Sequence, residues 1–168
     1  MHTLYVATVI VHLLAVMTWL GGMFFLMLVV VPWLRKGDRA QAARLLSETG
    51  TRFRTVGWIC FAVLAATGTA LLYFRGVTLD NLTDAGWRST GFGQMVLGKL
   101  LTFLGILGLS AVHDFRIGPM ASEAVSRDPN APEAERLRRL ASQMGRLNVI
   151  LGLLMVFFAV QIVRGTVF

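Results

Sequence analysis

Four long stretches of this chain are nearly free of charge, and they constrain its fold more than any other feature. Lys99 is the one charged residue that lies well inside any of them. The stretches cover residues 4–34, 55–74, 93–115 and 146–163. A helix needs about 20 mainly apolar residues to cross the hydrocarbon core of a bilayer. The sequence therefore predicts an all-α fold, a four-helix transmembrane bundle that forms a single integral membrane domain over residues 1–168.

The composition agrees with a membrane protein and excludes several soluble classes. Apolar residues make up 55% of the chain, charged residues make up 15%, and the mean hydropathy is +0.66. In a soluble domain about a quarter of the residues are charged. The single cysteine, Cys60, cannot close an intramolecular disulfide, and no zinc-binding Cys/His spacing includes it. A disulfide scaffold, a zinc ribbon and a disordered basic tail are therefore excluded.

The positive charges predict how the bundle is oriented. The net charge is +7, and twelve of the sixteen Lys and Arg residues lie in the first and third connections. These are Arg35, Lys36, Arg39, Arg44, Arg52, Arg54, Arg116, Arg127, Arg136, Arg138, Arg139 and Arg146. The positive-inside rule places both connections in the cytoplasm, so both termini are expected on the outer side, N-out and C-out. Because topology explains this charge, we expect the lipid bilayer as a partner and no nucleic acid.

The connections also carry signals for helix ends. Asp38 is a candidate N-cap for an amphipathic helix that ends near Gly50. The stretch 133–144 has a helical pattern that can run directly into the fourth span. Gly118-Pro119 is predicted to break the third span.

One face of the first stretch carries candidate metal ligands. At about 100° per residue, His12, Met23 and Met27 fall on the same side of a helix as Trp19. Imidazole and thioether groups suit Cu(I), and an ionisable side chain within a span usually faces a partner or a cavity. We therefore take His12, Met23 and Met27 as candidate metal ligands. The alternative is a Met-rich packing seam with one polar residue.

The third stretch carries a polar stripe at helical spacing. Its members are Lys99, Thr102, Ile106, Ser110, His113 and Asp114. Lys99 is a candidate cofactor ligand, although a lysine near the start of a span can also extend to the headgroups. His113 and Asp114 are candidate metal ligands at the cytoplasmic end, since a carboxylate beside an imidazole fixes its tautomer. The alternative is an interfacial cap or an ion pair with Arg116.

Depth decides which of these residues can meet. At a rise of about 1.5 Å per residue, Lys99 lies roughly 24 Å from Phe115, and His12 lies roughly 33 Å from Leu34. Both are therefore expected in the outer half, within reach of one cofactor if the first helix tilts. His113 is expected near the inner surface. Two separate sites, or a path between them, are thus predicted, rather than one haem that bridges His12 and His113.

The chain resembles a known family in several short motifs. They are His12 with Trp19-Leu-Gly21-Gly22, Pro32, Arg52-Phe-Arg-Thr-Val-Gly57-Trp58, Lys99-Leu-Leu, His113-Asp114-Phe115 and Gly118-Pro119. These motifs are similar to those of the small, stand-alone members of the copper-resistance D family, which are four-helix membrane proteins. The resemblance implies copper transport or resistance in the bacterial inner (cytoplasmic) membrane. Candidate partners are a second copy of the chain, as a homodimer, and a periplasmic copper-binding protein.

The first span is also similar to the J-type membrane protoporphyrinogen oxidase. That resemblance implies a haem b site at His12 and Lys99, and hence a membrane redox protein or enzyme as the alternative function. No catalytic residue is assigned. The sequence contains no P-loop, HExxH or dinucleotide-binding motif, so ATP hydrolysis is not supported. A third reading is a structural membrane partner that binds no metal.

Overall fold

The computed structural model describes residues 1–34 and 39–165, and this part of the chain is helical with no strand. Within this part of the chain, the side chains of residues 34, 39–44, 46 and 47 are not described. Four helices are long and apolar enough to cross a membrane, as the sequence predicted: His2–Trp33, Glu48–Phe74, Gly91–Arg127 and Pro132–Arg164. Asp38, the candidate N-cap, lies outside the described residues.

The first span contains a long helix, a π turn and a short helix, and the third span has the same three parts. The first consists of α1 (His2–Phe25), η1 (Leu26–Val30) and α2 (Val31–Leu34), and the third of α6 (Gly91–Val112), η2 (His113–Ile117) and α7 (Gly118–Arg127). The second and fourth spans lie in α3 (Arg39–Phe74) and α8 (Pro132–Arg164), and two short helices, α4 (Leu79–Thr83) and α5 (Ala85–Ser89), precede α6.

The predicted break at Gly118-Pro119 is wrong, because the helix continues through it by a π turn. The Gly118 N–H donates to the His113 carbonyl, one residue further back than in an α-helix. Pro32 lies two residues after the end of η1, just as Pro119 lies two residues after the end of η2. At η1 the Val31 N–H donates to the Leu26 carbonyl. A proline ring clashes with the carbonyl four residues before it and supplies no N–H. The wider turn accommodates both effects without ending the helix.

The second and fourth helices extend beyond the apolar stretches. α3 runs through Gly50 without ending, so the helix end predicted near Gly50 is wrong. α8 begins at Pro132 and continues to Arg164, which confirms that the predicted helix 133–144 runs into the fourth span. At the other end of α3, Gly76 has a φ of 74°, and this conformation lets the chain leave the helix.

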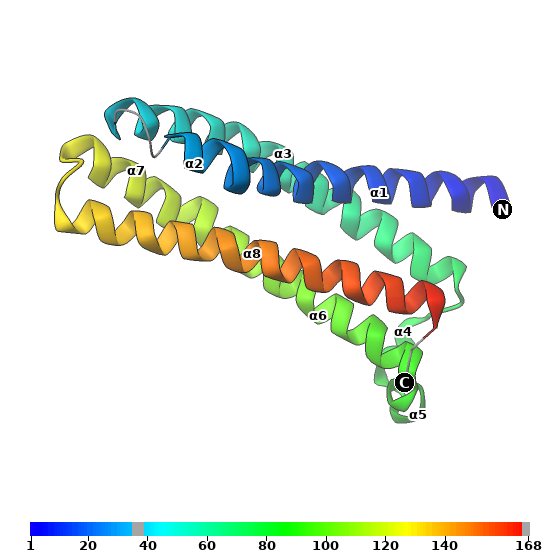
Figure 1. The fold of residues 1–168 in the computed structure, drawn as a ribbon. Helices are drawn as coiled ribbons and strands as arrows, with labels where there is room; N and C mark the ends of the chain where they lie inside the picture. The colour runs from blue at the N-terminus through cyan, green and yellow to red at the C-terminus, as the bar shows by residue number, and fades with distance from the viewer. Residues whose placement is uncertain (35–38, 166–168) are drawn as a thin grey trace.

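The helices pack as two antiparallel pairs, α1 with α3 and α6 with α8 (Figure 1). The chain reverses from α7 to α8 at the end of the bundle where α3 begins, and the N-terminus, α4 and α5 lie at the other end (Figure 1). We call the first the arginine-rich end, because Arg52, Arg54 and Arg127 lie near it. The opposite end is called the loop end.

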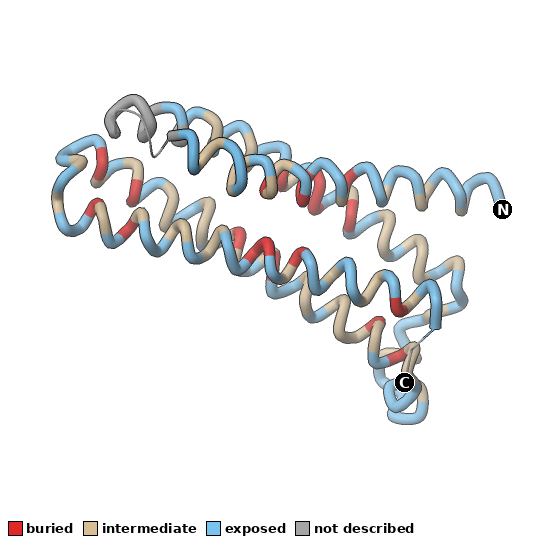
Figure 2. Tube along the Cα trace, in the orientation of Figure 1, coloured by how far each residue is buried: buried red, intermediate tan, exposed pale blue. Residues whose placement is uncertain are grey.

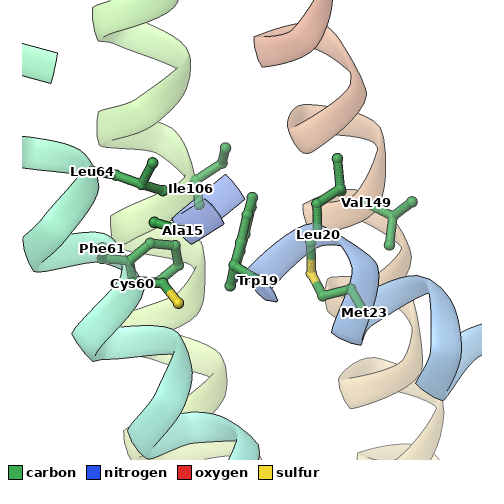
Figure 3. Packing of buried hydrophobic residues seen from close by; sticks show 9 residues of the cluster. All are labelled: Ala15, Trp19, Leu20, Met23, Cys60, Phe61, Leu64, Ile106 and Val149. Carbon is green, nitrogen blue, oxygen red and sulfur yellow. The ribbon is translucent and has the colours of Figure 1, made fainter. Parts of the chain in front are cut away.

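The core is a narrow apolar cluster between the helix pairs. Buried positions cluster on the inward sides of the helices, whereas the outer sides are exposed (Figure 2). Many of the exposed residues are large and apolar, including Leu14, Leu101 and Val163, as expected for a surface that faces lipid. Figure 3 shows Trp19 in the middle of the cluster, with Phe61 on one side and Leu20 on the other.

Candidate functional site

His12 is held by a neighbouring helix through one ring nitrogen. Its Nδ1 lies 2.7 Å from the Thr67 Oγ1 of α3. The Thr67 hydroxyl donates its proton to the Val63 carbonyl at 2.6 Å. Because a hydroxyl has a single proton, its oxygen must accept from His12, so Nδ1 carries the ring proton. The lone pair of a neutral His12 is therefore on Nε2, where it is free to bind a metal.

Two further residues shape the surroundings of His12. A Cβ added at Gly68 would lie 3.6 Å from the His12 Cε1, so glycine leaves space beside the ring. Lys99 of α6 is partly buried and close enough for its charge to act on His12 and to feel that of Arg75. Arg75 in turn donates to the Ile162 carbonyl at 2.9 Å. Lys99 therefore lies within the range of a charge interaction with His12, and one cofactor shared by the two residues stays a prediction.

His113 has a similar arrangement near the arginine-rich end. Its Nδ1 lies 2.9 Å from the Asp114 Oδ1, and the Trp58 Nε1–H donates to the other carboxylate oxygen at 3.1 Å. An ionised carboxylate only accepts hydrogen bonds, so Nδ1 of a neutral His113 is again the protonated nitrogen. Both carboxylate oxygens are engaged, which makes Asp114 the group that orients His113. Its predicted role as a metal ligand receives no support from this geometry.

The π turn explains how this network is held. In the π register the Asp114 carbonyl would accept from residue 119, but Pro119 has no N–H. The Arg54 guanidinium donates to that carbonyl instead, at 3.1 Å. Arg54 also lies over the Phe115 ring, 5.8 Å from its centroid. One proline therefore leaves a carbonyl free, and an arginine of another helix uses it to tie η2 to α3.

The two predicted methionine ligands do not lie near His12. At the α-helical rise, Met23 is about 16 Å and Met27 about 22 Å from His12 along the first helix, too far to share one ion. Met23 is 9% exposed and belongs to the apolar cluster, and Met27 packs against it. Within the described residues, no group of three or more His, Cys, Asp and Glu is placed to hold a metal.

The remaining polar residues of the third helix do not form a continuous path. Thr102 donates to its own helix at the Gly98 carbonyl, and Ile106 is 1% exposed within the apolar cluster. Ser110 accepts a hydrogen bond from the Asn148 Nδ2 of α8 at 3.0 Å. The Asn148 Oδ1 is buried and has no partner. The polar stripe therefore supplies local contacts at separate levels.

Aromatic rings separate the two histidines. Trp19 packs on Phe61 with ring centroids 5.1 Å apart, and Phe61 packs on Phe103 and Trp58 at 6.2 and 5.5 Å. Thr67 and Trp58, which belong to the His12 and His113 networks, lie about 13 Å apart along α3. The structure thus places the imidazoles of His12 and His113 at different levels of the bundle, in agreement with their predicted depths.

Sequence reasoning missed Thr67, Trp58 and Arg54 as parts of these sites. Thr67 is a polar residue on the second span, but a threonine there commonly donates to a carbonyl of its own helix. The sequence therefore does not indicate that Thr67 also contacts His12 of α1. Trp58 and Arg54 lie at the end of an apolar stretch, where such residues usually contact headgroups. Only the packing of α3 against η2 shows that they contact Asp114.

Comparisons with known proteins give a consistent result. The family model described as copper resistance protein D matches residues 47–162. The chain is 30% identical over 155 residues to an uncharacterized protein of Aquifex aeolicus, covering 92% of each chain. It is 26% identical over 147 residues to the copper resistance protein D of Pseudomonas syringae, covering 86% of this chain and 45% of that protein. No solved structure matches.

Proposed function

The chain belongs to the copper resistance protein D family, an assignment that makes it an integral membrane protein related to copper resistance, and we propose that it handles Cu(I) at His12. One observation carries the proposal. Thr67 holds the His12 Nδ1–H inside the bundle and leaves Nε2 as a free donor. Metal-binding histidines usually have their second nitrogen fixed in this way.

Lys99 is the second donor of the proposed site. As a neutral amine it has a lone pair for the metal, and as an ammonium it repels a cation from the neighbouring His12. Binding of Cu(I) therefore requires Lys99 to release a proton, because metal ligands must be deprotonated. Two nitrogen donors form a small ligand set, which suits an ion that is passed on.

The orientation follows from the arginines. In the proposed arrangement the arginine-rich end faces the cytoplasm of a bacterial inner membrane and both termini lie outside. His12 then lies in the outer half, where a periplasmic copper-binding protein can deliver the ion. The exposed apolar surface of α1 is the proposed contact for a second copy of the chain.

Copper binding by variants tests the proposal. The purified protein is loaded with Cu(I) under reducing conditions and titrated against a coloured Cu(I) chelator. We expect His12→Gln and Lys99→Leu to lose Cu(I) binding at this site, and Lys99→Met to keep it, since a thioether also binds Cu(I). His2→Gln is the matched control, because His2 is exposed at the N-terminus. An unchanged titration of His12→Gln would overturn the proposal.

A haem b site is the second candidate, and its support is that Lys99 of α6 lies within the range of a charge interaction with His12 of α1. His12 and Lys99 would hold such a haem, which would supply one-electron redox chemistry. The His12 and Lys99 variants described above would weaken the binding of either copper or haem. The optical spectrum and the metal content of the purified protein distinguish them.

A further inference from the structure

We propose that His113 is a second Cu(I) site, separate from His12 and close to the arginine-rich end. The inference rests on the proposed copper function and deepens it. It assigns Asp114 as a positioning residue and the His113 Nε2 as the metal donor. Three observations on η2 support it.

The first observation is the tautomer. The Asp114 carboxylate accepts from the Trp58 Nε1–H with one oxygen and lies 2.9 Å from the His113 Nδ1 with the other. Its Trp58 bond fixes the carboxylate, and the fixed carboxylate keeps the ring proton on Nδ1. The lone pair of His113 therefore points away from this network, as it does in a carboxylate–histidine pair at a metal.

The second observation is access. The His113 side chain is 32% exposed, whereas that of Asp114 is 18% exposed. The orienting side chain is thus the more buried of the two, and the imidazole side chain is the more exposed. An open site with one protein nitrogen binds a metal weakly and releases it readily, unlike a closed site with a full set of protein ligands.

The third observation is rigidity. Two hydrogen bonds hold the π turn. The Gly118 N–H donates to the His113 carbonyl, and the Arg54 guanidinium donates to the Asp114 carbonyl. These bonds fix the backbone at His113 and at the residue that follows it. A π turn inside an α-helix frequently marks a functional site, and here it presents His113 while its neighbour stays bound to α3.

Histidine nitrogen NMR tests the proposal directly, since the chain has only three histidines. The protein is labelled with 15N-histidine and studied at mildly alkaline pH, where an imidazole is neutral. Ag(I) serves as a diamagnetic substitute for Cu(I). We expect Nδ1–H signals for His12 and His113 without metal, and a shift of both Nε2 resonances when Ag(I) is added. Single His→Gln variants assign the signals.

Asp114→Asn gives the sharper test. Trp58 and His113 contact different oxygens of Asp114. Asparagine replaces one of these oxygens by an NH₂ donor, so only one of the two contacts keeps its acceptor. We expect its NH₂ to face the His113 Nδ1, which moves the ring proton to Nε2 and removes the Ag(I) shift at His113. His12 should respond as in the wild type. Asp128→Asn, in the exposed turn before α8, is the charge-matched control.

The outcomes separate the two proposals. A shift at His12 with none at His113 would overturn the second site and leave the proposed function standing. No shift at either histidine would overturn both. An Asp114→Asn variant whose His113 still responds to Ag(I) would show that Asp114 does not position the ring.

Discussion

The position of one proton on each imidazole decides what these residues can bind. Thr67 fixes that proton for His12 because its hydroxyl is already committed to the Val63 carbonyl. This dependence on a neighbouring oxygen is testable without changing the ligand itself.

Thr67→Val keeps the branched shape and removes the acceptor for His12. We expect its Cu(I) affinity to fall by about 10- to 100-fold, the usual effect of losing a group that orients a metal ligand. Thr67→Ser keeps the hydroxyl and should bind Cu(I) like the wild type. The chelator titration measures both, and equal affinities for the Val and Ser variants would show that Thr67 does not orient His12.

The buried Ser110–Asn148 pair gives a prediction about stability. Ser110→Ala leaves the Asn148 Nδ2 without its partner, and hydrogen bonds between membrane helices contribute about 1 kcal/mol. We expect this variant to be destabilised by a similar amount in thermal unfolding. In Ser110→Ala/Asn148→Leu both polar groups are gone, including the unpartnered Asn148 Oδ1, so stability should return to the wild-type level or above. A double variant that is less stable in thermal unfolding than Ser110→Ala would contradict this account.

The candidate donors could be predicted from the sequence, but their partners could not. An ionisable residue inside an apolar span is conspicuous, which is why His12 and Lys99 were found. Whether Thr67, Thr69 or no residue contacts His12 depends on the rotation of α3 against α1, and periodicity does not determine that rotation. The grouping of Met23 and Met27 with His12 rested on a shared helix face, and a shared face gives no distance along the helix.

At the scale of the helices, Gly98 of α6 leaves room for the Phe158 ring of α8. A Cβ at Gly98 would lie 2.6 Å from the Phe158 Cζ, whereas one at Gly105 would meet nothing within 4 Å. We expect Gly98→Ala to be less stable by about 1 to 3 kcal/mol, the usual effect of overpacking. Gly105→Ala should be neutral or more stable, because alanine loses less backbone entropy. Thermal unfolding in one detergent compares them, and equal stabilities would contradict the predicted packing.

Pro119 is predicted to maintain the π turn and, through it, the Asp114 network. Pro119→Ala restores an N–H and removes the ring clash, so the Asp114 carbonyl no longer needs Arg54. We expect the indole N–H resonance of Trp58 to shift as its bond to Asp114 changes. Pro129→Ala, in the turn before α8, should leave that resonance unchanged. An unaltered Trp58 signal in Pro119→Ala would show that the proline does not hold this network.

The helices themselves were the most predictable part of the fold. Their length and lack of charge are fixed by the bilayer, so all four could be found from the sequence. The continuation through Gly118-Pro119 could not, since proline usually ends or kinks a helix and the π turn depends on contacts with α3 and α8.

On the scale of the whole molecule, the bundle carries its two imidazoles at different levels with a cluster of aromatic rings between them. A passage from one site to the other therefore cannot follow a simple polar channel through that cluster. The family assignment and the free Nε2 of His12 favour copper as the ion concerned. The proposed pairing of His12 with Lys99 makes haem the alternative ligand.

One measurement tests the central claim most directly. The protein is purified in detergent from copper-supplemented cells, its visible spectrum is recorded oxidised and then reduced, and copper and iron are determined on the same sample. The account predicts bound copper, no haem band in the reduced state, and loss of the copper in His12→Gln. A reduced haem band with about one iron per chain, lost in the same variant, would contradict the copper assignment and make His12 a haem ligand.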